Sequence, residues 1–100
     1  DEEGDAMMED VIRRYACAAG RVQGVGFRMF VRQQAVMNDI TGWVMNMSDG
    51  TVTMELQGAA SAVEAAFAAM RAGNYFIRVE RLDIEERDPV SGERDFSIKY

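Results

Sequence analysis

The chain has 100 residues, of which 48% are hydrophobic and 28% are charged, and its formal net charge is −6. This length accommodates one domain with a single core, and no apolar run approaches the roughly 20 residues needed to span a membrane. There is no histidine, and Cys17 is the only cysteine. These counts exclude an internal disulfide and the nucleophile pairs that use histidine. We therefore expect a cytoplasmic protein whose chemistry depends on positioning, fixed charges or carboxylates.

The negative charge is concentrated at the N-terminus. Six of the 17 acidic residues lie within residues 1–10, so the other 11 balance the 11 basic residues. An acidic end of this kind is typically solvated, and we expect residues 1–10 to form a flexible segment ahead of a domain that spans residues 11–100. The neutral domain argues against nucleic acid as a partner, because such binding requires a basic surface.

The first predicted elements are a strand, a glycine-rich loop and a helix. The strand is Ile12–Ala19, and three glycines follow within Gly20–Gly26. The apolar residues then recur with helical spacing. They are Phe27, Phe30, Val31 and Ala35. Asp39 is a suitable end for this helix, because Asn and Asp enter the left-handed region more readily than most residues.

The middle of the chain predicts a β-hairpin. Thr41–Met47 and Thr51–Gln57 flank Ser48-Asp49-Gly50, and Asp-Gly is among the strongest short signals for a hairpin turn. In the second arm, the apolar residues Val52, Met54 and Leu56 alternate with polar ones. This period of two is typical of a half-buried strand.

A second helix and two strands complete the predicted order. Ser61–Glu64 has the pattern of a capping box, and the helix that it opens ends near Gly73. Ile77–Glu86 predicts a long strand whose alternation slips near Arg81, which indicates a bulge. Phe96–Tyr100 predicts a short last strand.

The elements predict an α+β protein of ferredoxin-like βαββαβ architecture. We expect an antiparallel sheet, two helices on one of its faces, and a short extra strand at the C-terminal end. In this topology the first helix crosses over between two parallel strands, so both strands end at the same edge of the sheet. The loop Gly20–Phe27 and the distant Asn46 are thus expected to meet at one rim.

The glycine-rich loop is a candidate anion site. Gly24 and Gly26 permit backbone angles closed to other residues, and successive N–H groups in such a loop can converge on an anion. The start of the helix adds partial positive charge, and Arg28 adds a guanidinium that can grip two phosphate oxygens. The alternative is a simple turn with a solvated arginine. A Walker-type site is excluded because no Gly-Lys-Ser/Thr follows.

Two segments resemble the acylphosphatase family. The nine residues from Gly20 to Arg28 resemble its signature, and Gly42–Val52 is similar to its second block, Gly-Trp-Val-x-Asn-x-x-Asp-Gly-x-Val. The resemblance covers residues 12–100. It implies a hydrolase that cleaves the carboxyl–phosphate bond of small acyl phosphates, without metal or cofactor. We expect the protein to be a monomer. The resemblance also implies that Arg28 binds the phosphate and that Asn46 orients the attacking water. The implied phosphate-binding residues are Gly20, Arg21, Val22, Gln23, Gly24, Val25, Gly26, Phe27 and Arg28.

Other interpretations compete with this one. A non-catalytic, anion-sensing module of the same fold could use the glycine loop but would not need Asn46. The family also implies that such a domain can open a larger carbamoyl-transfer protein, and we expect a free-standing enzyme here. Met45 and Met47 replace residues that are often hydroxylic or basic in relatives, which leaves the preferred acyl group open. Cys17 is expected to be a small core residue.

Overall fold

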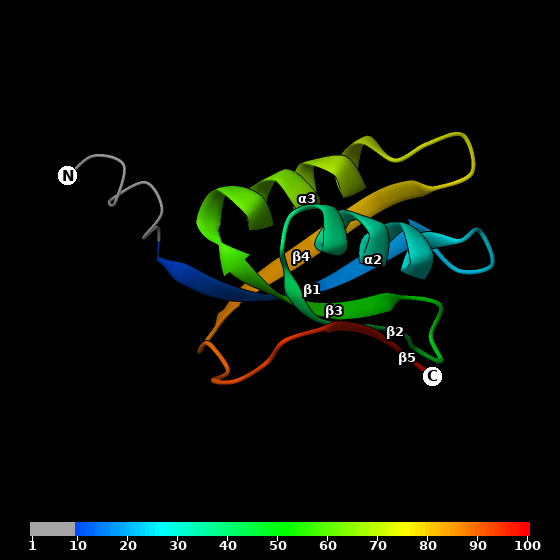
Figure 1. The fold of residues 1–100 in the computed structure, drawn as a ribbon. Helices are drawn as coiled ribbons and strands as arrows, with labels where there is room; N and C mark the ends of the chain where they lie inside the picture. The colour runs from blue at the N-terminus through cyan, green and yellow to red at the C-terminus, as the bar shows by residue number, and fades with distance from the viewer. Residues whose placement is uncertain (1–9) are drawn as a thin grey trace.

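The computed structural model describes residues 10–100, and the chain folds into two helices and five strands over this range (Figure 1). The elements are β1 (Val11–Arg21), α2 (Phe27–Met37), β2 (Thr41–Asn46), β3 (Val52–Ala59), α3 (Ala60–Ala72), β4 (Arg78–Arg87) and β5 (Phe96–Lys99). Residues 1–9 of the predicted acidic segment lie outside the described residues, so its flexibility stays a prediction.

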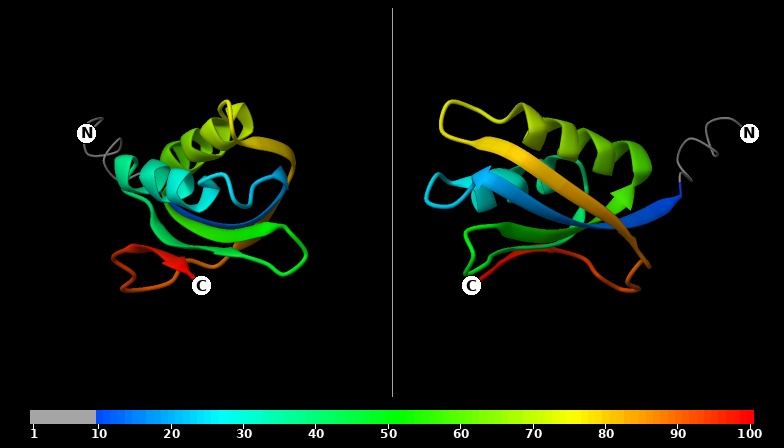
Figure 2. Two further views of the ribbon diagram at one scale, coloured as in Figure 1. Left: turned by 90° about the vertical axis from the view of Figure 1, so that its right-hand side faces the viewer. Right: turned by 180° about the vertical axis from the view of Figure 1, so that it is seen from behind.

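The sheet has the strand order β4-β1-β3-β2-β5. Both helices lie on one of its faces (Figures 1 and 2). The predicted ferredoxin-like fold with an extra C-terminal strand is therefore confirmed. The expectation of a wholly antiparallel sheet is corrected, because β5 pairs with β2 in parallel whereas the other strand pairs are antiparallel, so the sheet is mixed. The extra strand thus extends the sheet at the β2 edge.

The core lies between the sheet and the two helices. The predicted face of α2 is confirmed, since Phe27, Val31 and Ala35 are buried and Phe30 packs against them. α3 contributes the same helical spacing, and the strands contribute alternate residues. These further core residues include Ala16, Ala18, Val44, Val52, Met54, Leu56, Val63, Ala66, Phe67 and Met70. Burial of these side chains fixes which face of each strand meets the helices.

Two local predictions on the second half of the chain have opposite outcomes. The capping box at Ser61–Glu64 is wrong, because α3 begins at Ala60 with Ala59 as its N-cap. β3 continues directly into α3, which leaves no loop where a serine cap could stand before the helix. The predicted bulge is confirmed. Ala19 pairs with Arg81 and Gly20 pairs with Val79, so Glu80 is the extra residue.

The topology brings the predicted site segments to one edge. β1 and β2 both pair antiparallel with β3, so they run parallel to each other. The loop after β1 and the end of β2 therefore lie on the same side of the molecule, at the right in Figure 1. This is the edge at which Gly20–Phe27 and Asn46 were expected to meet.

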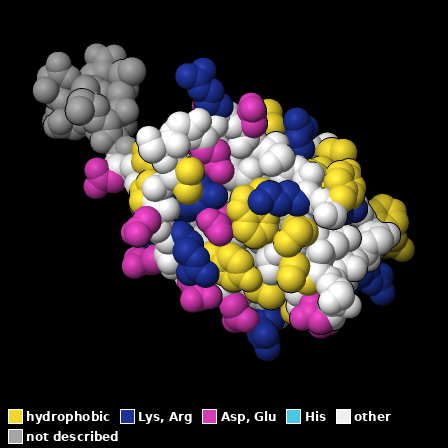
Figure 3. All heavy atoms as spheres, turned by 90° about the horizontal axis from the view of Figure 1, so that it is seen from below, with side chains coloured by type: hydrophobic (Ala, Val, Ile, Leu, Met, Phe, Trp, Pro, Cys, Tyr) yellow, Lys and Arg dark blue, Asp and Glu magenta, His cyan; other side chains and the backbone are white. Residues whose placement is uncertain are grey.

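The face of the sheet away from the helices is open, and Figure 3 looks onto it. A buried arginine organises one end of this face. Arg13 is only 3% exposed, and its guanidinium donates to Glu55 at 2.5 Å and to Glu93 at 2.8 Å. Burial alone would lower the pKa of Arg13, but the hydrogen bonds to these carboxylates outweigh it and raise the pKa above its ordinary value. The cluster fastens the β4–β5 connection to the sheet.

Replacing Arg13 with alanine is expected to lower the free energy of unfolding by about 3 kcal/mol, because it leaves two half-buried carboxylates without their cation. Urea denaturation measures this loss. Arg81→Ala is the control, since Arg81 pairs with Asp83 at 2.9 Å on the exposed surface. Its removal is expected to cost less than about 1 kcal/mol. Equal losses in the two variants would contradict a stabilising role for the Arg13 cluster.

Candidate active site

The loop between β1 and α2 takes its shape from two glycines. Gly24 and Gly26 have φ angles of 74° and 79°, in the region that other residues rarely enter. A Cβ atom at either position would meet nothing within 4 Å, so backbone conformation and not space requires the glycine. Gly26 is the N-cap of α2, without a side-chain cap, and its carbonyl accepts the N–H of Phe30 at 3.0 Å.

The start of α2 is electrostatically suited to an anion. The first N–H groups of a helix have no partner within the helix and carry partial positive charge. No acidic residue lies in the first turn of α2. An anion that binds at this end would therefore meet N–H donors and no competing carboxylate from the same turn.

A small pocket of about 180 Å³ joins this helix end to the end of β2. Its lining residues are Val22, Gly24, Gly26, Phe27, Arg28, Met29, Asn46, Ile98 and Tyr100. The structure thus brings Arg28 and Asn46 to one pocket, although 18 positions separate them in the sequence. The expectation that the two segments meet at one rim is confirmed as geometry.

Some of the predicted loop residues lie away from this pocket. Gly20 and Arg21 are the last residues of β1 and pair with Val79 and Arg78 of β4. The side chain of Val25 is half-buried and packs against the core. Four of the nine loop residues, these three and Gln23, do not line the pocket.

Arg28 lies in the first turn of α2 and is half-buried. Its guanidinium carbon is 4.9 Å from the centre of the Tyr100 ring, a distance typical of a cation–π contact. Within residues 10–100, no carboxylate forms an ion pair with Arg28. The Tyr100 side chain is 97% exposed, so this contact lies at the surface, and the N–H donors of Arg28 stay able to bind an anion.

Asn46 is the last residue of β2 and lines the pocket. The Oδ1 atom is buried and has no hydrogen-bond partner among residues 10–100. A buried polar atom without a partner is unfavourable and calls for an explanation in the native structure. An amide side chain carries an acceptor oxygen and N–H donors, so a pocket lined by Asn46 can bind a water molecule or a hydroxyl there.

The loop that follows Asn46 is held by its own hydrogen bonds. The carboxylate of Asp49 accepts the N–H of Thr51 at 3.0 Å and its hydroxyl at 2.6 Å. These two hydrogen bonds lower the pKa of Asp49 from its ordinary value. The predicted Ser48-Asp49-Gly50 turn is thus confirmed, and it keeps the two arms of the hairpin in register beside Asn46.

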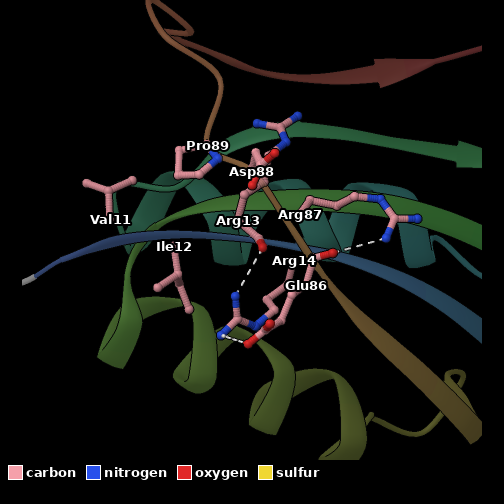
Figure 4. A pocket seen from close by; sticks show the side chains of 8 residues that line it. All are labelled: Val11, Ile12, Arg13, Arg14, Glu86, Arg87, Asp88 and Pro89. Atoms are coloured by element: carbon pink, nitrogen blue, oxygen red, sulfur yellow. Dashed lines mark hydrogen bonds and ion pairs between the residues drawn. The ribbon is translucent and has the colours of Figure 1, made fainter.

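A larger cavity, of about 580 Å³, lies between β1 and β4 and is a weaker candidate (Figure 4). Its arginines are already occupied by the chain itself. Arg14 lies 3.6 Å from the carboxylate of Glu86 and donates to the carbonyl of Arg13 at 3.1 Å. Arg87 donates to the carbonyl of Glu86 at 3.1 Å. An anion would have to compete with these partners, whereas Arg28 forms no ion pair with any residue from 10 to 100.

Sequence reasoning missed three residues of the pocket, Met29, Ile98 and Tyr100. Ile98 and Tyr100 reach it because β5 runs parallel to β2 and so ends at the same edge. The sequence predicts a strand at Phe96–Tyr100, but it carries no signal that this strand pairs in parallel with β2 and so ends at the pocket. Met29 is on the turn of α2 that carries Arg28.

Comparison with known proteins identifies the family. The acylphosphatase family model matches residues 14–98. The chain belongs to the acylphosphatase family. The predicted enzyme class is thereby confirmed, and a curated acylphosphatase from Geobacillus thermodenitrificans agrees with it. That relative is 48% identical over 88 residues, which cover 88% of this chain and 94% of the relative.

Solved structures of acylphosphatases and of a larger protein have the same fold. The crystal structure of acylphosphatase from Bacillus subtilis superposes with a TM-score of 0.84 and is 35% identical, covering 89% of this chain and 99% of that one. Full-length HypF, in its phosphate- and nucleotide-bound form, superposes with a TM-score of 0.80 at 28% identity. The match covers 91% of this chain but 12% of HypF. The acylphosphatase fold thus also occurs as a small part of a longer chain.

Cys17 does not line the pocket that contains Arg28 and Asn46. Its predicted core position is wrong, since Cys17 is half-buried while Ala16 and Ala18 are fully buried. Successive residues of a strand point to opposite faces, so the two alanines face the helices and Cys17 lies on the open face. The register pairs it with Thr53 of β3 and Asp83 of β4.

Two further findings concern metals and membranes. Within residues 10–100, no group of three or more His, Cys, Asp or Glu side chains is arranged to hold a metal ion. Among these residues, neither helix has the length and apolar character needed to cross a membrane.

Proposed function

We propose that the chain hydrolyses the carboxyl–phosphate bond of small acyl phosphates, releasing a carboxylate and inorganic phosphate, without a metal ion or cofactor. One observation carries this proposal. A single small pocket is lined by the guanidinium of Arg28, the two loop glycines and the Asn46 amide, whose buried oxygen has no partner among residues 10–100. The pocket therefore combines donors for an anion with an amide side chain that can bind water.

The phosphate is held by Arg28 and by the backbone of the loop. The guanidinium presents a planar pair of N–H donors to two phosphate oxygens. Gly24 and Gly26 let the backbone approach the anion closely, and the start of α2 adds further N–H donors. These donors also neutralise the charge that gathers on the phosphoryl group during transfer.

Asn46 holds the attacking water. Its Oδ1 accepts a hydrogen bond from the water and directs the water's oxygen at phosphorus, opposite the carboxylate that leaves. Asn46 is neutral and cannot take a proton, so the proton of the water passes to a phosphoryl oxygen of the substrate. The carboxylate is a leaving group of low basicity and departs without a general acid. Alignment and charge stabilisation then supply most of the acceleration.

The donor set of the pocket supports catalysis without a metal. The lining residues include an arginine and an asparagine but no Asp or Glu, so a divalent cation would find no side-chain carboxylate among them. A cation would also be repelled by Arg28. The positive charge that a metal supplies elsewhere comes from the guanidinium and the helix end.

We further propose that the enzyme acts as a cytoplasmic monomer without a nucleic-acid partner. The even balance of acidic and basic residues after residue 10 supports the last point. The non-catalytic, anion-sensing alternative is not favoured by the family, and it gives no reason for the orphan oxygen of Asn46. The two functions differ in turnover, since a sensor would bind phosphate but not hydrolyse an acyl phosphate.

Benzoyl phosphate hydrolysis is the test of this proposal, and the expected result is turnover that is unchanged by EDTA. Phosphate release is measured with the purified protein before and after chelation, and again after addition of Mg²⁺ or Zn²⁺. Binding of phosphate without any turnover would support the sensor. Activity that is lost in EDTA and returns with a metal would overturn the metal-free mechanism.

A further inference from the structure

The side chain of Gln23 joins the glycine loop to the hairpin that carries Asn46. Its Nε2 donates to the carbonyl oxygens of Met47 and Thr51, both at 2.8 Å. Met47 directly follows Asn46 in the chain, and Thr51 directly precedes Val52, the residue paired with Asn46 in the sheet. The amide group of Gln23 thus donates hydrogen bonds to both ends of the hairpin loop.

The other hydrogen bonds of this hairpin loop are internal to it. The N–H of Met47 donates to the carbonyl of Thr51 at 2.8 Å, and that of Gly50 donates to the carbonyl of Met47 at 3.2 Å. They fix the shape of the hairpin but not its position relative to the phosphate-binding loop. Within residues 10–100, the two bonds from Gln23 are the hydrogen bonds that connect the loop at 22–26 with the hairpin.

We infer that Gln23 is a positioning residue for hydrolysis, which holds Asn46 at a fixed place relative to the bound phosphate; this inference rests on the proposed function. In-line attack requires the water and the phosphorus atom to be aligned, and the two are held by different segments of the chain. A displacement of about 1 Å between reacting groups can lower a rate by as much as about 10²-fold. Because Gln23 belongs to the phosphate loop itself, it makes the two halves of the site move together.

The test replaces Gln23 with methionine, which has a similar length and shape but no N–H donor. The expected result is a fall of about tenfold in kcat for benzoyl phosphate, with an inhibition constant for inorganic phosphate that changes less than about twofold. Phosphate binding is spared because Arg28 and the loop backbone remain. Gln33→Met is the matched control, since Gln33 is exposed on α2, and its kcat is expected to equal that of the parent.

A double-mutant cycle separates positioning from a general loss of structure. If Gln23 acts through Asn46, Gln23→Met added to Asn46→Ala is expected to lower kcat by less than about twofold further. Gln23→Asn keeps the amide but shortens the side chain by one methylene, so the same fall in kcat is expected. This variant replaces Gln23→Met in the test if Gln23→Met does not fold.

Three outcomes would overturn the inference. The first is a parental kcat in a folded Gln23→Met or Gln23→Asn variant. The second is an equal fall in the parental and Asn46→Ala backgrounds, which would indicate a purely structural role. The third is a parent that binds phosphate but does not hydrolyse benzoyl phosphate, which would overturn the proposed function as well. Only the third outcome contradicts the proposed function, so a failure of the Gln23 inference can be distinguished from a failure of the proposed function.

Discussion

Arg28→Ala is expected to abolish inhibition by inorganic phosphate and to lower kcat/KM for benzoyl phosphate by about 10³-fold or more. The guanidinium is the positively charged side chain among the residues that line the pocket. Within residues 10–100 it has no carboxylate partner, so its removal leaves no unpaired protein charge behind. The loss therefore reports on the substrate and not on the fold. Steady-state kinetics and the phosphate inhibition constant measure it, with thermal unfolding as the check on structure.

Arg28→Lys distinguishes charge from shape. A lysine keeps the positive charge but lacks the planar, two-point grip on phosphate oxygens, so it is expected to restore little of the lost kcat/KM. Arg71→Ala is a control for net charge, because Arg71 is exposed at the end of α3 and does not line the pocket. If phosphate inhibits the lysine variant as strongly as the parent, the role given to the guanidinium is wrong.

The fold could be predicted because its strands and helices alternate with distinct periods. Val52, Met54 and Leu56 repeat at two positions, and all are buried on the face that meets the helices. Phe27, Val31 and Ala35 repeat at helical spacing, and all are buried as well. Such periodicity depends on local sequence alone. The spacing of apolar residues along the chain was therefore sufficient to predict most of the architecture.

Features that depend on distant partners could not be predicted. Arg13 is charged and lies in a strand, where sequence alone gives no reason to bury it. It is buried because Glu55 and Glu93 come from other parts of the chain to meet it. Ser61–Glu64 matches a capping box, yet the uninterrupted passage from β3 to α3 starts the helix earlier. Tertiary context overrides local preference in both cases.

The candidate site was predictable in its parts but not in its assembly. Glycines before a helix, followed by Arg28, indicate an anion site from chemistry alone. The crossover topology then predicted that Asn46 would lie beside them. The contacts of Tyr100 and Gln23 could not be predicted, because the first depends on the parallel pairing of β5 and the second on two carbonyls more than 20 residues away.

Asn46→Ala is expected to lower kcat for benzoyl phosphate by about 10²–10³-fold while leaving the phosphate inhibition constant close to that of the parent. Asn46 is proposed to hold the water and not the phosphate, so its loss affects the chemical step alone. The Oδ1 atom has no hydrogen-bond partner among residues 10–100. Truncation therefore breaks no described bond to that oxygen, and the thermal midpoint is expected to stay near that of the parent.

Asn46→Asp is the companion variant, because it keeps the shape of the side chain and places a negative charge beside an anionic substrate. It is expected to weaken phosphate binding as well as turnover, whereas Asn46→Ala weakens turnover alone. Measuring kcat and the phosphate inhibition constant for both variants distinguishes an effect on water positioning from an effect on phosphate binding. If Asn46→Ala keeps most of its kcat, or loses phosphate binding as severely as Arg28→Ala, Asn46 does not orient the water. The anion-sensing alternative would then regain support, since it has no use for an acceptor opposite Arg28.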